Sequence, residues 1–433
     1  MKGFGTDGIR GRSGRTPIDM EGARRIGGAC ARWAQEVGTG RVLVLRDTRR
    51  SGPTLGACAL GAVTFSGGIA MDGGVAPTAA LMNALELGFA DVGLMITASH
   101  NPATDNGFKV MGPGGQKIDA PTAKMLERYM GEGPQAGEGG IHREVSRDIR
   151  EAYASVFADR VGDLAAMAGR HLVLDLAHGA GTTSLDWIRE ALLPHTTLTV
   201  LGAGEGTIND GVGSEYPERL AQEVRALGAD AGLAVDGDAD RCVLVDDTGA
   251  IVHGDALAWW LARACRAECL AVTVMSNQAV EASLPGVEVI RTKVGDKYLA
   301  EAMRSQGASL GVEASGHALF KDGLVGGDGL FTGLRALSAA WAHHASLSEA
   351  LTPFTPFPSR LEALEVRERP PLESIASLHA LVEAAPARLG GGRLFPRYSG
   401  TQDVLRLLVE GPDAAAVDAV MDEAMAAVRE ALG

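Results

Sequence analysis

The sequence predicts an α/β protein with three similar α/β domains on mixed sheets, a smaller C-terminal α+β domain, and an active-site cleft between them. Three observations support this fold class. Short apolar strands alternate with polar turns and helix-like runs, as in parallel α/β units. A strand of small apolar residues that ends abruptly in polar side chains occurs three times, at a spacing well above the usual repeat period. The last part of the chain lacks this pattern.

The strand–turn–helix units identify the first strands of each domain. An apolar run at 42–45 precedes a polar turn at 46–49, and similar runs lie at 172–174 and 270–274. Each run is too short for a buried helix and is followed by turn residues, which favours a strand. The alternation therefore predicts three parallel α/β units.

A second set of strands leads directly into polar loops. The strand at 90–94 precedes Thr97-Ala98-Ser99-His100-Asn101-Pro102, and the strand at 229–233 precedes Asp236-Gly237-Asp238-Ala239-Asp240-Arg241. The strand at 308–312 precedes Glu313-Ala314-Ser315-Gly316-His317. Because ligands bind outside the carboxyl ends of strands in open α/β sheets, the three loops are expected to share a cleft.

Segments rich in glycine or proline indicate the domain boundaries. A glycine-rich loop at 131–140 lies near the first boundary, and prolines at 353, 356 and 358 mark a stiff linker before a mobile last domain. Apolar residues from 417 to 432 recur at helical spacing and predict a C-terminal helix. The expected domains are a phosphoserine-loop domain at 1–150, a metal-binding-loop domain at 151–246, a sugar-binding-loop domain at 247–357 and a C-terminal phosphate-binding domain at 358–433.

Composition narrows the class of protein. The 433 residues include 40 Lys+Arg against 54 Asp+Glu, a net charge of −14, which argues against nucleic-acid and anionic-membrane partners. The start of the chain lacks the apolar core of a signal peptide, and glycines and a proline interrupt the longest uncharged stretch, 51–71. We expect a cytoplasmic protein with reduced cysteines. The 58 glycines indicate many turns or loops that approach a ligand closely.

Asp236, Asp238 and Asp240 form the most specific cluster. Like charges at this spacing raise one another's pKa, and a hard divalent cation relieves the crowding through oxygen ligands. An EF-hand loop is excluded because Arg241 and Asp247 stand where it requires glycine and glutamate. A solvated acidic turn is the alternative; the strand context favours a metal site.

Ser99 is a candidate nucleophile or phosphate carrier, with His100 beside it and Pro102 fixing the backbone. The segment lacks the G-x-S-x-G elbow of α/β-hydrolases, and a plain turn is the alternative. A tight turn at 105–107 brings Lys109 back towards this serine, where it is a candidate phosphate contact or only a surface lysine.

Other segments offer groups for anions and sugars. Arg397, Ser399, Gly400 and Thr401, with Arg406 nearby, form a candidate phosphate cradle or a common turn. Glu313, Ser315 and His317 suit sugar hydroxyls, and a helix-entry cap is the alternative. The glycine-rich start at 3–11 is a candidate anion-binding loop that does not fit the P-loop pattern.

Taken in their order along the chain, these segments resemble the α-D-phosphohexomutase family over essentially the whole length. The segments 97–102 and 236–241 together are highly specific for this family. Phe4 to Gly11, Thr207-Ile208-Asn209 and Arg291 to Asp296 resemble the family's bacterial phosphoglucosamine mutase branch. Four departures stand out: Ala239 replaces a usual glycine, Ala314 a usual glutamine, Tyr398 a usual proline, and Gln402-Asp403 a usual Glu-Pro.

The resemblance implies a role for each site residue. Ser99 would carry the phosphoryl group, and one Mg²⁺ would bind to Asp236, Asp238, Asp240 and an oxygen of phospho-Ser99. Arg10, His100, Lys109 and Arg241 would surround the transferred group. The residues implied to bind substrate are Glu313, Ser315, His317, Arg397, Ser399, Gly400, Thr401 and Arg406.

The implied activity is that of an intramolecular phosphotransferase, an isomerase of carbohydrate metabolism. It would interconvert glucosamine 6-phosphate and glucosamine 1-phosphate through a phosphoserine enzyme and a hexose bisphosphate, which is both intermediate and activator. A phosphomannomutase/phosphoglucomutase is the enzyme alternative, and a non-catalytic sugar-phosphate-binding paralogue is the alternative from another class. A small phosphosugar is the expected partner, and the sequence leaves open whether the protein is a homodimer.

Overall fold

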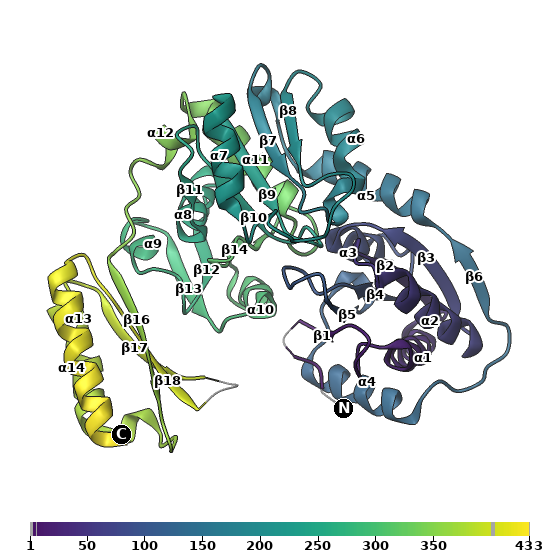
Figure 1. Cartoon of the computed structure of the whole chain (residues 1–433), viewed down its shortest axis with the longest axis horizontal. Helices are drawn as coiled ribbons and strands as arrows, with labels where there is room; N and C mark the ends of the chain where they lie inside the picture. The colour runs from purple at the N-terminus through teal and green to yellow at the C-terminus, as the bar shows by residue number, and fades with distance from the viewer. Residues whose placement is uncertain (1–2, 6, 400–402, 433) are drawn as a thin grey trace. The chain divides into compact units, whose positions relative to one another are not determined.

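The computed structural model describes residues 3–5, 7–399 and 403–432, and its elements are shown in Figure 1. The chain divides into two compact units. The first comprises Met1–Val274 and Glu288–Leu351, and the second comprises Met275–Val287 and Thr352–Gly433.

The first sheet of the first unit has six strands in the order β1-β5-β4-β2-β3-β6. Its core strands β4, β2 and β3 are parallel, whereas β5 runs antiparallel to both β4 and β1. The strands are β1 (Ile9–Arg12), β2 (Arg41–Arg46), β3 (Ile69–Val75), β4 (Val92–Ile96), β5 (Asp105–Met111) and β6 (Ile141–Glu144). The accompanying helices are α1 (Met20–Val37), α2 (Gly52–Phe65), α3 (Thr78–Glu86), η1 (Pro113–Gly115), α4 (Ala120–Glu132) and α5 (Ser146–Arg160).

The second sheet has five strands in the order β11-β10-β9-β7-β8. The strands β9, β7 and β8 are parallel, and β10 is antiparallel to β9 and β11. The strands are β7 (His171–Asp175), β8 (Thr197–Leu201), β9 (Ala231–Val235), β10 (Cys242–Val245) and β11 (Ile251–Val252). The helices are η2 (Ala165–Met167), η3 (Ala180–Ser184), α6 (Leu185–Trp187), η4 (Ile188–Leu192) and α7 (Pro217–Leu227).

The third sheet has four strands in the order β13-β12-β14-β15, with β15 antiparallel to its neighbour. The strands are β12 (Cys269–Thr273), β13 (Glu288–Thr292), β14 (Leu310–Val312) and β15 (Ala318–Phe320). The helices are α8 (Gly254–Ala264), α10 (Asp296–Gln306), α11 (Gly329–His343) and α12 (Leu347–Leu351). Helix α11 packs against β9 and β10 of the second sheet.

The three sheets share one plan, which confirms the predicted triplication with mixed sheets. The orders β5-β4-β2-β3, β10-β9-β7-β8 and β15-β14-β12-β13 correspond strand for strand, with the same directions. In each sheet, the strand that precedes a polar loop is followed by the antiparallel strand beside it. The two strands are joined by a short connection, so the polar loop lies at one end of the sheet.

A glycine at the second position of β4, β9 and β14 explains part of the repeated pattern. A Cβ at Gly93 would lie 2.8 Å from Leu85 of α3, and one at Gly232 would lie 2.8 Å from Leu220 of α7. A Cβ at Gly311 would lie 3.1 Å from Leu299 of α10. The absence of a side chain lets each helix pack closely on its strand. All three strands are fully buried.

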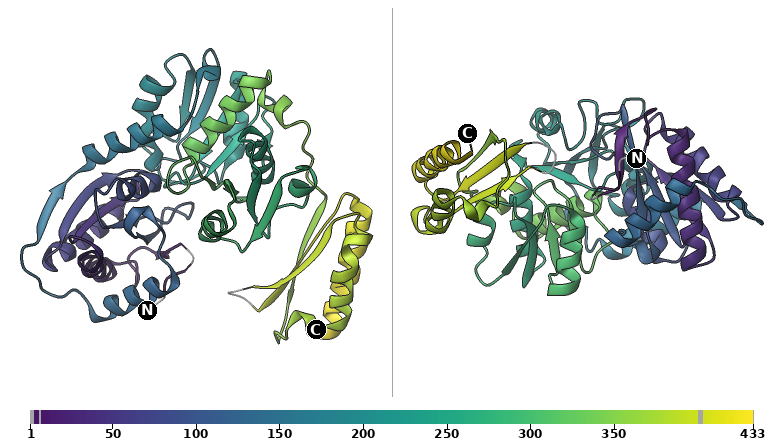
Figure 2. Two further views of the ribbon diagram at one scale, coloured as in Figure 1. Left: turned by 180° about the vertical axis from the view of Figure 1, so that it is seen from behind. Right: turned by 90° about the horizontal axis from the view of Figure 1, so that it is seen from below.

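The second unit contains an antiparallel sheet in the order β16-β18-β17, with α13 and α14 along one face in both views of Figure 2. Its elements are α9 (Ala279–Ala282), β16 (Ser359–Glu365), η5 (Leu372–Ser374), α13 (Ala376–Arg388), β17 (Arg393–Tyr398), β18 (Val404–Glu410) and α14 (Ala414–Leu432). The apolar side of α14 is buried in the core of this unit, which confirms the predicted C-terminal helix and α+β domain.

The predicted domain boundaries remain a proposal, and two observations bear on them. Strand β11 pairs with β10 across the proposed boundary at 246. The segment Met275–Val287 belongs to the second compact unit, where the Asn277 side chain bonds to both the N–H and the C=O of Phe357. Within the part of the chain that the structure describes, we find no helix with the length and apolar character needed to cross a membrane.

Candidate active site

Three loops of the first unit carry the candidate chemistry, and each joins a parallel strand to its antiparallel neighbour. We call them the serine loop (residues 97–104, between β4 and β5), the metal loop (236–241, between β9 and β10) and the sugar loop (313–317, between β14 and β15). The N–H of Cys242, directly after the metal loop, donates to the C=O of Gly316 in the sugar loop over 3.1 Å, and Ser99 Oγ of the serine loop lies 2.5 Å from Asp236 Oδ2 of the metal loop. The repeated topology therefore brings loops far apart in the sequence to one place.

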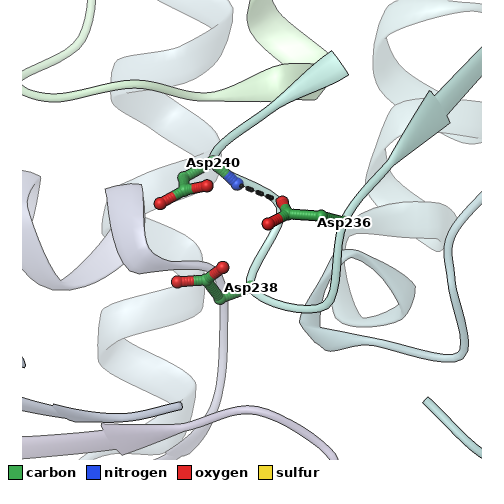
Figure 3. Close-up of side chains that lie close together, drawn as sticks. All are labelled: Asp236, Asp238 and Asp240. Carbon is green, nitrogen blue, oxygen red and sulfur yellow. Dashed lines mark hydrogen bonds between the residues drawn. The ribbon is translucent and has the colours of Figure 1, made fainter. Parts of the chain in front are cut away.

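The carboxylates of Asp236, Asp238 and Asp240 point toward one another (Figure 3). One oxygen of each lies within 4.8 Å of the others, and all three residues are buried. Asp236 Oδ1 accepts the N–H of Asp240 at 3.1 Å, which fixes the turn of the loop. Burial together with the charges of Asp240 and Asp238 raises the pKa of Asp236 well above its usual value. A solvated acidic turn is thus excluded.

The loop fits a hard metal ion. Asp238 Oδ1 and Asp240 Oδ1 are buried and have no hydrogen-bond partner among the described residues. Buried carboxylate oxygens without partners are costly, and an all-oxygen donor set suits Mg²⁺ or Ca²⁺. Asp238 Oδ2, in contrast, accepts from the Thr78 hydroxyl at 2.6 Å and from Lys109 Nζ at 2.7 Å. The carboxylate oxygens that do not contact Lys109 are therefore free to contribute to one metal site.

Ser99 lies directly against the metal loop. Its Oγ is 2.5 Å from Asp236 Oδ2, and the residue is fully buried. The backbone of Ser99 has φ of +52°, a left-handed conformation that few residues other than glycine adopt. A ring nitrogen of His100 lies 3.4 Å from Ser99 Oγ. The hydroxyl is therefore placed at the metal site, with an imidazole beside it.

Lys109 and His100 differ in charge. Lys109 is only 2% exposed, so it is not a surface lysine, and its Nζ contacts Asp238, Asp240 and Asp7. Although burial opposes the charge, these carboxylates raise the pKa of Lys109 well above its usual value. Burial, with help from Arg241 and Arg10, lowers the pKa of His100 to about 4. His100 is neutral at neutral pH and can accept a proton.

A cavity of about 430 Å³ lies beside these groups, within the size range of small-molecule sites. Its walls come from the N-terminal glycine-rich loop, the metal loop, residues 294–296 and the sugar loop. Arg10 and Arg241 line it, and Arg10 donates to Asp7 Oδ2 at 2.5 Å. The glycine-rich start therefore forms one wall of a cavity that is also lined by Arg10 and Arg241.

The sugar loop connects two strands, which excludes the helix-cap alternative for Glu313, Ser315 and His317. Glu313 Oε1 accepts the N–H of Gly295 at 2.9 Å, and Glu313 and His317 line the cavity. Ser315 is exposed and donates to Glu313 Oε2 at 3.3 Å. The carboxylate of Glu313 and the imidazole of His317 thus line the same cavity.

The residues proposed for the phosphate cradle lie in the second unit. Arg397 of β17 stands directly opposite Arg406 of β18, so the two partly buried guanidinium side chains share a sheet face. Two guanidinium groups on one sheet face can together bind an anion through charge-assisted hydrogen bonds. The buried Ser399 donates from its N–H to Val404 O at 2.8 Å. Gly400 and Thr401 lie outside the described residues.

Sequence reasoning missed several groups that organise the site. Lys117 bonds to Asp7 at 2.5 Å and pairs with Asp296, and Asp296 Oδ2 is 3.3 Å from His317 Nε2. Opposing the effect of burial, Lys117 and His317 lower the pKa of Asp296. Asp296 belongs to a segment already singled out, but Lys117 followed no motif. Its role is visible only once the N-terminal loop and α10 are brought together.

Known proteins resemble the chain over nearly its whole length. Family models described as phosphoglucomutase/phosphomannomutase match at residues 1–137 (alpha/beta/alpha domain I), 253–357 (alpha/beta/alpha domain III) and 361–427 (C-terminal domain). A phosphoglucosamine mutase of Sphingopyxis alaskensis is 35% identical, covering 99% of each chain, and one of Mycobacterium sp. strain KMS is 37% identical, covering 95% of each. The crystal structure of a phosphoglucomutase/phosphomannomutase family protein from Burkholderia thailandensis superposes with a TM-score of 0.81 at 26% identity, covering 98% of this chain and 97% of that one.

Proposed function

The chain belongs to the phosphoglucomutase/phosphomannomutase family of the α-D-phosphohexomutases, and we propose that it interconverts glucosamine 6-phosphate and glucosamine 1-phosphate. The observation that carries this proposal is the 2.5 Å contact between Ser99 Oγ and Asp236 at the metal loop. The choice of glucosamine rests on the phosphoglucosamine mutases that resemble the chain over nearly its full length. The proposed site of action is the cytoplasm.

In the proposed reaction, Ser99 Oγ carries a phosphoryl group. The substrate hydroxyl attacks phosphorus and gives its proton to neutral His100. The bond from phosphorus to Ser99 Oγ breaks with its electron pair staying on the serine oxygen, which takes up a proton from His100, and a hexose bisphosphate forms. The bisphosphate then reorients, and its other phosphoryl group returns to Ser99 Oγ. Phosphoryl transfer depends mainly on positioning and on charge neutralisation, which the buried loops supply.

The residues of the chain divide the work between charge and proton transfer. Lys109, Arg10 and Arg241 offset negative charge on the moving phosphoryl group. Neutral His100, 3.4 Å from Ser99 Oγ, is placed to exchange the proton of that hydroxyl. Asp236, Asp238 and Asp240 would hold Mg²⁺, which when bound neutralises charge on the phosphoryl oxygens. Glu313 and His317 would orient the sugar hydroxyls.

In the second unit, Arg397 and Arg406 would bind the phosphate that does not react. Ser399 and the neighbouring Gly400 and Thr401 would complete that cradle. Because the two phosphates exchange roles between half-reactions, this cradle must accept the sugar in either orientation.

The test is an assay of the purified protein with Mg²⁺ and a hexose bisphosphate on the 1-phosphates of glucosamine, mannose and glucose. We expect turnover of the glucosamine ester, and loss of turnover in the Ser99→Ala variant. Preference for mannose or glucose would transfer the assignment to a phosphomannomutase/phosphoglucomutase. Absence of turnover with every sugar would contradict the enzyme assignment. Intact mass adds a check, because an active preparation carries one phosphate on part of its chains.

A further inference from the structure

The strained backbone of Ser99 is held by buried side chains that have no role in the proposed chemistry. A left-handed backbone is strained in a residue other than glycine and persists where the surroundings over-determine it. At Ser99, with φ of +52°, this conformation brings Oγ within 2.5 Å of Asp236. The groups that fix the backbone therefore also fix where the hydroxyl points.

Arg49 holds the carbonyl side of the serine loop. Its guanidinium is 1% exposed and donates to the C=O groups of Ser99 at 2.7 Å and Asn101 at 2.8 Å. It also donates to Pro102 O at 2.6 Å and Asp105 O at 3.0 Å. A fully buried arginine bonded to three carbonyls of the serine loop and to the first carbonyl of β5 leaves that loop little freedom.

Asn209 binds the same two carbonyls from the second sheet's side. Its Nδ2 donates to Ser99 O at 2.7 Å and to Asn101 O at 3.0 Å. Asn209 follows β8, whereas Arg49 follows β2, so the two donors reach the loop from different sheets. The carbonyl of Ser99 is thus fixed by two independent elements of the fold.

The N–H of Ser99 is held through the same network of buried side chains. Thr97 Oγ1 accepts this N–H at 2.8 Å and donates to Asp47 Oδ2 at 2.6 Å. The same Asp47 oxygen accepts from Arg49 Nε at 2.9 Å. Both ends of the Ser99 residue are therefore tied to one buried carboxylate, through Thr97 on one side and Arg49 on the other.

We propose that Arg49 and Asn209 are positioning residues that hold Ser99 in its left-handed conformation, with Oγ aimed at the metal loop. The catalytic consequence of this inference rests on the proposed function, whereas the restraint on the loop does not. Loosening one donor lets the Ser99 carbonyl rotate and moves Oγ away from Asp236. Neither residue lines the cavity beside Arg10 and His317, so substrate binding is left intact.

The variant that tests this is Asn209→Ala, with Asn83→Ala as its matched control. Asn83 is also fully buried and also donates to two carbonyls, Ala79 O at 2.7 Å and Val325 O at 3.3 Å, but it does not contact the serine loop. Asn83→Ala loses one bond more than Asn209→Ala, because Asn83 Oδ1 also accepts the N–H of Val325 at 3.2 Å. Asn209→Ala, in turn, places alanine at a backbone φ of +58°. For Asn209→Ala alone we expect kcat to fall about 10- to 100-fold with KM within about 2-fold, because each tenfold corresponds to about 1.4 kcal/mol of transition-state positioning.

Hydrogen exchange supplies a readout that is independent of activity. We expect the amides of residues 98–106 to exchange at least about 10-fold faster in Asn209→Ala than in Asn83→Ala. Equal exchange and equal kcat in the two variants would overturn the proposal. Faster exchange with unchanged kcat would overturn the positioning role. If the wild-type protein turns over no phosphosugar, the proposed function fails, and exchange in the serine loop alone decides whether the restraint exists.

Arg49→Lys is the second variant, because it keeps the charge opposite Asp47 but offers a single donor group in place of the planar guanidinium. Complete removal of Arg49 would leave Asp47 as a buried charge without its cation and endanger folding. We expect Arg49→Lys to speed exchange over residues 98–106 and to lower kcat in the same direction as Asn209→Ala. Wild-type exchange and wild-type kcat in Arg49→Lys would contradict its assigned role.

Discussion

The metal loop and the arginine pair of the second unit bind charge in opposite ways. Around Asp236, Asp238 and Asp240, the polar groups are buried and tied to one another at fixed distances. Arg397 and Arg406 are only partly buried, on facing antiparallel strands. At the proposed site of bond making and breaking, charges are fixed in a low dielectric, which strengthens every interaction. At the proposed phosphate cradle, partial exposure would keep the exchange of one phosphate for another reversible.

The largest expected effect comes from Asp236→Asn. Burial and two neighbouring carboxylates disfavour the ionised form of Asp236, so its raised pKa means that at neutral pH the charge costs stability in the metal-free protein. We expect a higher Tm for Asp236→Asn without Mg²⁺, loss of the Tm increase that Mg²⁺ gives the wild type, and turnover reduced at least about 1,000-fold. Calorimetry with and without Mg²⁺, alongside the mutase assay, measures all three.

Asp246→Asn is the control for that variant, because Asp246 is also buried and follows β10 of the same sheet, where it caps a turn through Thr248. Its Mg²⁺ response and kcat are expected to match the wild type. A Mg²⁺-dependent rise in Tm that survives in Asp236→Asn would contradict the metal assignment.

The other side of the comparison is tested by Arg397→Ala. Loss of a charged contact to phosphate is expected to lower kcat/KM about 10- to 100-fold, mainly through KM. The Mg²⁺ response is expected to stay unchanged because the metal loop belongs to the other unit. Arg360→Ala, which removes ion pairs with Asp418 and Asp422 in the same unit, is expected to leave KM unchanged. An equal rise in KM in both variants would show a general effect on that unit.

A smaller effect is expected on the pH dependence of stability, through Asp328 beside the metal loop. Asp328 accepts the Tyr153 hydroxyl and the N–H of Phe331, and the next residue, Gly329, donates to Ala239 O of the metal loop. Burial raises the pKa of Asp328 from 3.8 to about 6. Because the pKa of Asp328 is raised in the folded state, its protonated form stabilises the folded protein. This contribution is fully present below pH 3.8 and is lost as the pH rises through about 6.

Asp328→Asn removes this titration while keeping a side chain that caps a helix well. The unfolding free energy of the wild type relative to the variant is therefore expected to fall between pH 4.5 and 7.5, by at most about 3 kcal/mol. Urea unfolding at both pH values measures the difference. A difference that stays constant, or grows with pH, would contradict the assigned shift.

The smallest expected effect is at Ala239, where this chain departs from the family's usual glycine. Its φ is +59°, in the left-handed region that glycine adopts without strain. We expect Ala239→Gly to stabilise the protein by about 0.5–1 kcal/mol and to leave the Mg²⁺ response unchanged. Thermal unfolding measures this, and a lower Tm would show that packing of the Ala239 methyl group outweighs the strain.

Much of the candidate site was predictable because strand patterns place loops without knowledge of side-chain contacts. The aspartates at two-residue spacing and Ser99 followed from their position after apolar strands, and the structure brings them within hydrogen-bond distance. Arg49 was read only as part of a polar turn, and Asn209 only as part of a motif. Their roles depend on the path of the serine loop, which no local pattern encodes.

The sequence by itself determined the threefold repeat, the polar loop after each repeated strand, and the separate C-terminal unit, because strand periodicity and turn chemistry are local properties. Only the tertiary structure decided which buried charges meet. Lys109 contacts Asp238 across 129 positions, and Ser99 contacts Asp236 across 137. The physical reason is that burial and electrostatic coupling depend on distance in space, and the packing of three sheets sets those distances.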